Sequence, residues 1–227
     1  MRLPSFEREE EVAIPIDMRF DIARNANRYY QKYHKQRRAQ GILKEQIALC
    51  EQTIAYFEQL ESQVELAAVP DAMEIREELV KRGYMNAQKS GIRRRKGKQI
   101  PHFTVFDIEG TLVYLGKNNI QNEYLTRTLA RKDDLWFHTK NLHGSHVICT
   151  DPQPDERLLR ICAMLAAYYS QGRFSSSVPV NYCPVRQLKK VPGSAPGAVT
   201  MQHYRTIYMD PSQKEVTEII RQYQKKA

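Results

Sequence analysis

The sequence has few cysteines and no long apolar run, and each shortage excludes a class of protein. Its four cysteines, Cys50, Cys149, Cys162 and Cys183, lie far apart without a Cys-x-x-Cys pair. They predict reduced thiols in a cytoplasmic protein, with neither a zinc site nor a disulfide framework. No apolar stretch approaches the ~20 residues that a membrane-spanning helix needs. Residues 1–16 are too acidic and too interrupted by proline for a signal peptide, so nothing in the sequence directs export.

Familiar catalytic and metal-binding patterns are also missing. Three histidines, His138, His143 and His146, are close in sequence, but no acidic or cysteine ligand stands at a spacing typical of zinc. Ser145 directly precedes His146, yet neighbouring side chains on an extended segment point apart, which argues against a nucleophile and its base. We therefore expect a non-catalytic protein with no metal and no cofactor.

Acidic residues are scarcer than basic ones. Among 227 residues, 35 Lys and Arg stand against 26 Asp and Glu, which gives a formal net charge of +9. This surplus favours polyanionic partners such as RNA, although solubility alone can account for part of it. The hydrophobic content of 41% is sufficient for one sizeable core.

The first part of the chain predicts a helical arm. Residues 1–17 are expected to be an extended, largely unstructured segment, at whose end Asp17 caps a helix. Over residues 18–87, residues recur in alternating steps of four and three, and all but the polar Gln36, Gln40 and Glu61 are apolar or small: Met18, Ile22, Ala26, Tyr29, Tyr33, Leu43, Ile47, Cys50, Ile54, Phe57 and Val64. This coiled-coil seam predicts one helix from residue 18 to about residue 67, because its phase continues through Gly41. The seam also predicts self-association, unless a shorter helix expected at residues 71–84 covers part of it.

Residues 88–101 are expected to form a basic linker. Its cations include Arg93, Arg94, Arg95, Lys96 and Lys98, and it has hardly any apolar residue. Like-charged runs are usually only solvated, but on a basic protein they also suit phosphate contact, which gives affinity without base selectivity.

Candidate binding residues concentrate in residues 115–150, LGKNNIQNEYLTRTLARKDDLWFHTKNLHGSHVICT. Gly116 is expected to take a positive φ after a strand, and Asn118 or Asn119 to cap the next helix. Lys117 then stands beside free backbone N–H groups at a positive helix end, where phosphate can bind. A plain turn with a solvated lysine explains these residues at least as well. In the helix itself, Gln121 and other polar residues fall largely outside the apolar face.

Side chains along the strand that follows alternate between two faces. One row comprises Leu135, Phe137 and Thr139, and the other comprises Trp136, His138 and Lys140. The second row can stack a base and neutralise a phosphate, as binding of single-stranded or loop RNA requires. A tryptophan on a strand is nevertheless more often part of a core, and this alternative stays open.

The remaining residues complete a compact domain at 102–211. It is expected to contain two strands joined at Glu109-Gly110, a helix over 154–171, a strand over 178–183 and two closing strands. Pro179 indicates an edge strand or a strand start. Lys189 and Lys190 belong to a loop rich in proline and glycine, and residues 212–227 are expected to form a terminal helix. The predicted fold class is α+β, a long coiled-coil helical arm followed by a compact mixed α/β domain.

The stretch GKNNIQNEYLT, followed by DDLWFHTK and GSHVICT, resembles the signature of the NFACT-R domain. This domain is the RNA-binding module of the bacterial fibronectin-binding protein A/RqcH family and its archaeal and eukaryotic relatives. The resemblance extends from about Phe103 to Pro211, and more loosely back to Ile14. One departure is His143, which stands where the family usually has proline. Full-length relatives begin with an NFACT-N domain and a helix-hairpin-helix region, so this sequence resembles a carboxy-terminal portion.

The resemblance implies a role in ribosome-associated quality control. Family members bind a large ribosomal subunit obstructed by a stalled peptidyl-tRNA, recruit aminoacylated tRNA, and promote untemplated addition of residues, alanine in the bacterial branch. The expected partners are therefore tRNA and the large ribosomal subunit. The expected RNA-binding residues are Lys117, Asn118, Asn119, Trp136, His138, Lys140, Ser145, His146, Lys189, Lys190 and the five cations of the basic linker.

A second interpretation is an adhesin on the cell surface, because streptococcal and related family members are described as binding fibronectin or fibrinogen. That role would require unconventional export, since the sequence has no export signal.

Overall fold

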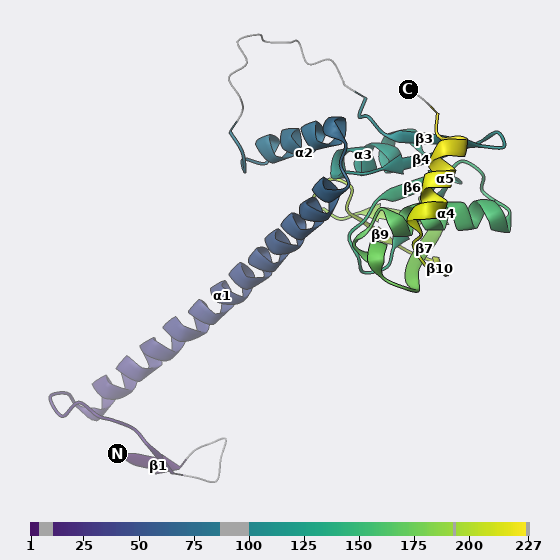
Figure 1. Cartoon of the computed structure of the whole chain (residues 1–227). Helices are drawn as coiled ribbons and strands as arrows, with labels where there is room; N and C mark the ends of the chain where they lie inside the picture. Colours follow the sequence, from purple (N-terminus) through teal and green to yellow (C-terminus); the bar gives the residue numbers. More distant parts are fainter. Residues whose placement is uncertain (5–10, 87–99, 193, 226–227) are drawn as a thin grey trace. The chain divides into compact units, whose positions relative to one another are not determined.

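The computed structural model describes residues 1–4, 11–86, 100–192 and 194–225 (Figure 1). The chain divides into two compact units, Met1–Ile54 and Ala55–Ala227. Helix α1 (Ile22–Glu65) contributes to both units. None of the helices within these ranges has the length and apolarity needed to cross a membrane.

The first unit begins with a pair of short strands. β1 (Arg2–Pro4) lies antiparallel to β2 (Glu11–Ala13), with Arg2 opposite Ala13. The amino-terminal segment was predicted to be largely unstructured, and this prediction is wrong where the two strands pair.

Helix α1 begins at Ile22 and continues without a break through Gly41. The prediction of one long helix is therefore confirmed. The helix starts four residues later than predicted, because the Asp21 carboxylate, rather than that of Asp17, accepts the hydrogen bond from the Arg24 amide (2.7 Å).

Large apolar side chains of α1 are exposed in the first unit. Leu43, Ile47 and Ile54 have exposed fractions of 59%, 56% and 58%. Within residues 11–54, no other element covers this part of the predicted seam. Self-association through it stays a prediction.

A six-stranded antiparallel sheet forms the centre of the second unit (Figure 1), with its strands in the order β10-β7-β5-β6-β4-β3. The strands are β3 (Thr104–Ile108), β4 (Thr111–Gly116), β5 (Leu135–Thr139), β6 (His146–Cys149), β7 (Val178–Pro184) and β10 (Arg205–Met209). β3 and β4 form the predicted hairpin, and Glu109 and Gly110 have positive φ values of 53° and 89° in its turn. Pro179 lies near the start of β7, which is an interior strand and not an edge.

Two helices cover one face of this sheet. They are α4 (Glu156–Tyr168) and α5 (Gln213–Tyr223), which pack on the larger core together with Leu135 and Phe137 of β5. Asp155 caps α4. Leu135 and Phe137 thus share one face of β5, as the predicted alternation requires.

The opposite face of the sheet carries a smaller core. Its cover consists of α3 (Asn119–Tyr124), the π-helical turn η1 (Leu125–Leu129) and the hairpin of β8 (Leu188–Lys190) and β9 (Val199–Met201). Leu125, Trp136, Ile148 and Cys183 are buried in this core. Because both faces are covered at β5, alternate side chains of this strand are buried on both sides. The short 3-10 turns η2 (Gln171–Phe174) and η3 (Val185–Gln187) complete the domain.

A third core joins the end of α1 to helix α2 (Val69–Lys81). It is formed by Tyr56, Leu60 and Ile75. Helix α2 also contacts α3, so this helical pair lies against the segment that the sequence marks as the candidate site.

Candidate RNA-binding site

The turn between β4 and α3 requires glycine for space rather than for a positive φ. A Cβ at Gly116 would stand 2.5 Å from Asn122 Oδ1, and the same oxygen accepts a hydrogen bond from the His146 amide (3.1 Å). Gly116 is not among the positive-φ glycines of the described residues, so that prediction is wrong. The close approach of α3 to the end of β4 explains the glycine.

Asn118 is fully buried at the start of α3. Its Oδ1 accepts a hydrogen bond from the Gln121 amide (2.9 Å), which confirms the predicted cap, while its Nδ2 donates to Glu74 Oε2 (2.8 Å). The backbone N–H of Lys117 donates to Gln121 Oε1 (2.8 Å) and is therefore not free for a ligand. These bonds contradict the prediction that Asn118 contacts phosphate.

Asn119 is equally buried and contacts both helices of the arm. Its Nδ2 donates to Glu78 Oε1 (3.2 Å). Its Oδ1 accepts from the side-chain amides of Gln59 (2.8 Å) and Gln63 (2.9 Å). All three of these bonds are internal, so the prediction of a phosphate contact by Asn119 is also contradicted.

Three carboxylates of α2 surround the same turn. The Gln121 side chain, predicted to lie outside the core, is buried and donates to Asp71 Oδ1 and Glu74 Oε2, both at 2.7 Å. Glu78 is 2% exposed, and burial raises its pKa. Carboxylates so close to the turn repel a phosphate. We call this set the arm network; its members are Gln59, Gln63, Asp71, Glu74, Glu78, Asn118, Asn119 and Gln121.

Trp136, His138 and His146 form a second group, which we call the ring cluster. The Trp136 ring lies 5.5 Å from that of His138 and 5.1 Å from that of His146, and the two imidazoles are 5.3 Å apart, measured between centroids. Trp136 is only 1% exposed. It is a core residue, so the prediction of an open stacking platform is wrong.

The two imidazoles of the ring cluster are uncharged at neutral pH. Burial lowers the pKa of His138 to about 4 and lowers that of His146 well below its usual value. His146 and Ser145 are 5% and 4% exposed, which contradicts the surface role predicted for both. His138 remains partly exposed and can offer a neutral hydrogen-bonding group.

A row of polar residues continues from His138 across the sheet. Strand pairing places His138 opposite Asn181, and Asn181 opposite Thr206. The hydroxyl of exposed Thr206 donates to Asn181 Oδ1 (2.8 Å). The sequence analysis did not select Asn181 and Thr206, because their strands lie far from His138 in the sequence. The alternation of side chains along β7 was the only signal for Asn181.

Three of the predicted lysines contribute exposed positive charge to this domain. Lys140 follows β5, whereas Lys189 and Lys190 lie on strand β8 and not in the predicted loop; all three are exposed. Lys190 Nζ is 2.9 Å from Glu123 Oε1, which offsets part of its charge. Lys117 is partly buried. Among the predicted lysines that the structure describes, Lys140 and Lys189 are therefore exposed and have no ion pair with another described residue.

Sequence reasoning also missed a neighbouring pair of cations. Lys132 and Arg186 are exposed, and the Arg186 amide donates to the Lys132 carbonyl oxygen (3.0 Å), while the Arg186 guanidinium pairs with Asp133, which offsets part of its charge. The predicted linker cations, Arg93, Arg94, Arg95, Lys96 and Lys98, lie outside the described residues. Within the residues that are described, no group of His, Cys, Asp and Glu is arranged to hold a metal ion.

Comparison with known proteins gives matches along the chain. Residues 1–99 match the NFACT N-terminal and middle domains, and residues 100–203 match the NFACT protein RNA binding domain. The chain is 38% identical over 217 residues to the Rqc2 homolog RqcH of Bacillus subtilis and 35% identical over 219 residues to that of Streptococcus pneumoniae. These alignments cover 94% and 96% of the chain but only 38% and 39% of the relatives, so it spans about two fifths of their length.

A solved structure supports the same assignment. The C-terminal of the fibronectin/fibrinogen-binding protein from Streptococcus suis is similar with a TM-score of 0.78 and 33% identity, over 88% of this chain and 80% of that one. Sequence and fold therefore agree that the chain belongs to the NFACT protein family and carries its RNA-binding domain.

Proposed function

We propose that this chain is the RNA-binding part of a ribosome-associated quality-control factor. The match of residues 100–203 to the family's RNA-binding domain carries the proposal. The similarity of the whole chain to Rqc2 homologs supports the role in ribosome-associated quality control. The accessible charge of Lys140 and Lys189, on a protein of net charge +9, supports attraction to phosphate.

The proposed partners are tRNA and the large ribosomal subunit, in the cytoplasm. The chain's contribution is to bind and position RNA without catalysing a reaction. The whole factor would use that binding to promote alanine addition to stalled nascent chains. Partly exposed His138 and exposed Thr206, which lie on either side of Asn181, provide neutral groups for hydrogen bonds, while the lysines contact the RNA phosphates.

A charge-reversal experiment tests this proposal. The chain is titrated with tRNA, large ribosomal subunits and polyuridine at several salt concentrations. Lys140→Glu combined with Lys189→Glu should weaken tRNA binding on the order of tenfold or more, because two phosphate contacts become repulsions. The matched control is Lys35→Glu with Lys44→Glu, an equal charge change on exposed residues of α1. Equal losses in both variants would show that only net charge matters and would contradict a site on this domain.

A second candidate function is binding of fibronectin or fibrinogen at the cell surface. It is favoured by the description of the similar Streptococcus suis protein as fibronectin/fibrinogen-binding. Cell fractionation separates the two functions, because ribosome-bound protein sediments with large subunits and is released by ribonuclease. Protein recovered at the surface, with no ribosomal fraction, would favour the second function.

A further inference from the structure

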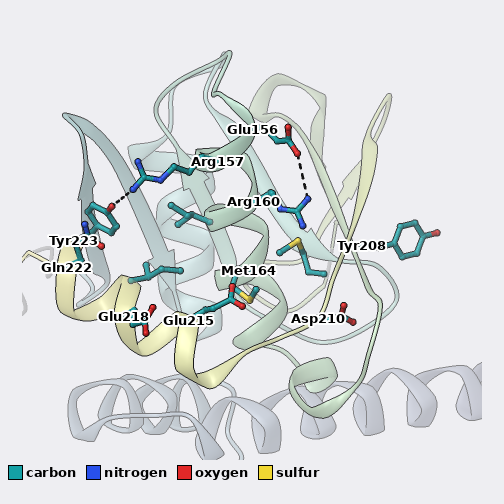
Figure 2. Close-up of a pocket in the computed structure, with 13 residues that line it drawn as sticks. Glu156, Arg157, Arg160, Met164, Tyr208, Asp210, Glu215, Glu218, Gln222 and Tyr223 are labelled. Carbon is teal, nitrogen blue, oxygen red and sulfur yellow. Dashed lines mark hydrogen bonds and ion pairs between the residues drawn. The ribbon is translucent and has the colours of Figure 1, made fainter.

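The edge strand β10 presents an aromatic side chain to solvent. Tyr208 has 65% of its surface exposed. Its neighbours along the strand, Ile207 and Met209, pack in the larger core beneath α4 and α5. Because side chains alternate along a strand, Tyr208 lies on the opposite face of the sheet, the face that carries the ring cluster. Figure 2 shows the Tyr208 ring pointing away from the labelled side chains of α4 and α5.

Strand pairing aligns Tyr208 with two other residues of that face. Tyr208 stands opposite Pro179 of β7. The backbone N–H of Lys140 donates to the Pro179 carbonyl oxygen (2.8 Å), so Lys140 continues the register of β5 against β7. Tyr208 and Lys140 are therefore two strand spacings apart, about 10 Å. We call Tyr208, Pro179 and Lys140 the outer row.

A second row, made of hydrogen-bonding groups, lies two residues away along each of the three strands. It comprises Thr206, Asn181 and His138. Asn181 is 2% exposed, and its Oδ1 accepts a hydrogen bond from the Thr206 hydroxyl (2.8 Å). Thr206 is exposed and His138 is partly exposed, as are Tyr208 and Lys140 of the outer row in greater measure. One face of the sheet thus brings together an accessible aromatic ring, a cation and two neutral hydrogen-bonding groups.

This combination of groups suits an unpaired nucleotide. Every base has a π-face that can stack on an exposed aromatic ring, whereas the bases of a duplex are stacked on one another. A lysine beside the ring can contact the phosphate of the stacked nucleotide or of its neighbour, and hydroxyl and imidazole groups can bond the base edge. The carboxylate of Asp210, two residues after Tyr208, accepts a hydrogen bond from the Ser177 amide (2.6 Å).

We propose that Tyr208 is a base-stacking platform of this domain and that the outer row binds a single-stranded segment of RNA. The base stacks on Tyr208, Lys140 contacts an adjacent phosphate, and Thr206 and His138 are available to the edge of the base. The inference rests on the proposed RNA-binding function and deepens it, because it names the class of RNA as unpaired rather than duplex. The platform is thus a ring on the edge strand and not the enclosed Trp136.

Titration of the full chain with two RNAs tests the proposal. One RNA is single-stranded, and the other is a fully paired hairpin of the same length and charge. Tyr208→Ala should weaken binding of the single strand on the order of tenfold and change binding of the hairpin little. The slope of log affinity against log salt should stay the same, because no phosphate contact is lost. Lys140→Ala should instead reduce this slope by about 1 for the single strand.

Two further variants serve as controls. Tyr208→Phe keeps the ring and should bind the single strand as the unmodified chain does. Tyr30→Ala removes a tyrosine of similar exposure, 63%, from α1 and should leave the preference for single-stranded RNA unchanged. Thermal melting should show that every variant is folded.

Photocrosslinking locates the stacked base directly. The single strand carries one 5-iodouridine, which crosslinks to an aromatic ring stacked on it. Trypsin cleaves after Arg205 and Lys214, and Tyr208 is the only aromatic residue of the peptide between them. Mass spectrometry should therefore find the nucleotide on this peptide.

The outcomes separate this inference from the function on which it rests. A chain that binds neither RNA contradicts both. The inference alone is overturned if RNA binds but Tyr208→Ala keeps full affinity for the single strand, if Tyr30→Ala loses as much, or if the crosslink falls on other peptides only.

Discussion

The arm network and the ring cluster both take residues from the segment Gly116 to His146, and the polar atoms of these residues are used differently in the two groups. In the arm network, both polar atoms of Asn118 and of Asn119 are hydrogen-bonded. In the ring cluster, Trp136 Nε1 and His146 Nδ1 have no hydrogen-bond partner among the described residues, and on the arm helices Gln63 Oε1 and Glu78 Oε2 also have none. One group anchors the helical arm and the other fills a core, so we expect RNA to contact the exposed lysines nearby.

The two groups also respond to pH in opposite directions. Glu78 of the arm network has a raised pKa, so its contribution to stability is lost as pH rises above the usual carboxyl range. His138 has a lowered pKa, so its contribution is lost as pH falls below 6.5 toward about 4. Burial disfavours the charged form of both groups. The charged form is the deprotonated carboxylate for Glu78 and the protonated imidazole for His138, so the two pKa values shift in opposite directions.

The largest expected effect is on the ring cluster. Trp136→Ala should lower the free energy of unfolding by about 3–5 kcal/mol, because it empties a fully enclosed site between the sheet and the β8–β9 hairpin. RNA affinity of the folded fraction should change little. A stacking platform would instead lose about 1–3 kcal/mol of binding while keeping its stability.

Denaturant unfolding and an RNA titration of the same sample distinguish these outcomes. Trp136→Phe is the matched control, because it keeps an aromatic ring and a smaller cavity. A folded Trp136→Ala variant with normal stability and lost RNA affinity would reverse the assignment.

Much of the fold can be predicted from the periodicity of apolar residues, but whether each candidate residue is buried or exposed cannot. The seam of α1 and the alternation of Leu135 and Phe137 are local patterns, and the structure keeps both. That Trp136 is enclosed depends on a hairpin more than fifty residues later, which no local pattern reveals. The roles of Asn118 and Asn119 are equally ambiguous in the sequence. An asparagine that caps a helix and bonds a buried carboxylate cannot be distinguished there from an asparagine that faces solvent.

The second prediction concerns the arm network. Asn119→Ala should cost about 2–3 kcal/mol of stability, because the side chains of Glu78, Gln59 and Gln63 all lose a buried partner. The matched control, Asn27→Ala on the exposed surface of α1, should have little effect. If Asn119→Ala left stability unchanged but weakened tRNA binding, Asn119 would be a ligand and the comparison of the two groups would fail.

The third prediction uses the pH response of the ring cluster. The unfolded chain protonates His138 near 6.5, whereas the folded protein does so only at about 4, so stability should fall as pH drops through this range. Between pH 7 and 5, the unmodified chain should lose about 1–2 kcal/mol more than His138→Phe. Phenylalanine keeps the contact with Trp136 but cannot take up a proton.

Urea unfolding at four or five pH values measures this difference. His203→Phe is the control, because His203 is exposed. A pH response of His138→Phe that equals the response of the unmodified chain would assign the acid sensitivity to another group.

The smallest expected effect separates two adjacent lysines outside both groups. Lys189 is exposed without a recorded ion pair in the described residues, whereas Lys190 Nζ lies 2.9 Å from Glu123 Oε1. Lys189→Ala should reduce the slope of log affinity against log salt by about 1, as loss of one phosphate contact requires. Lys190→Ala should change this slope less, because the lysine's charge is partly offset within the protein. Titrations with tRNA at several salt concentrations compare the two, and a larger change for Lys190 would show that RNA displaces the ion pair with Glu123.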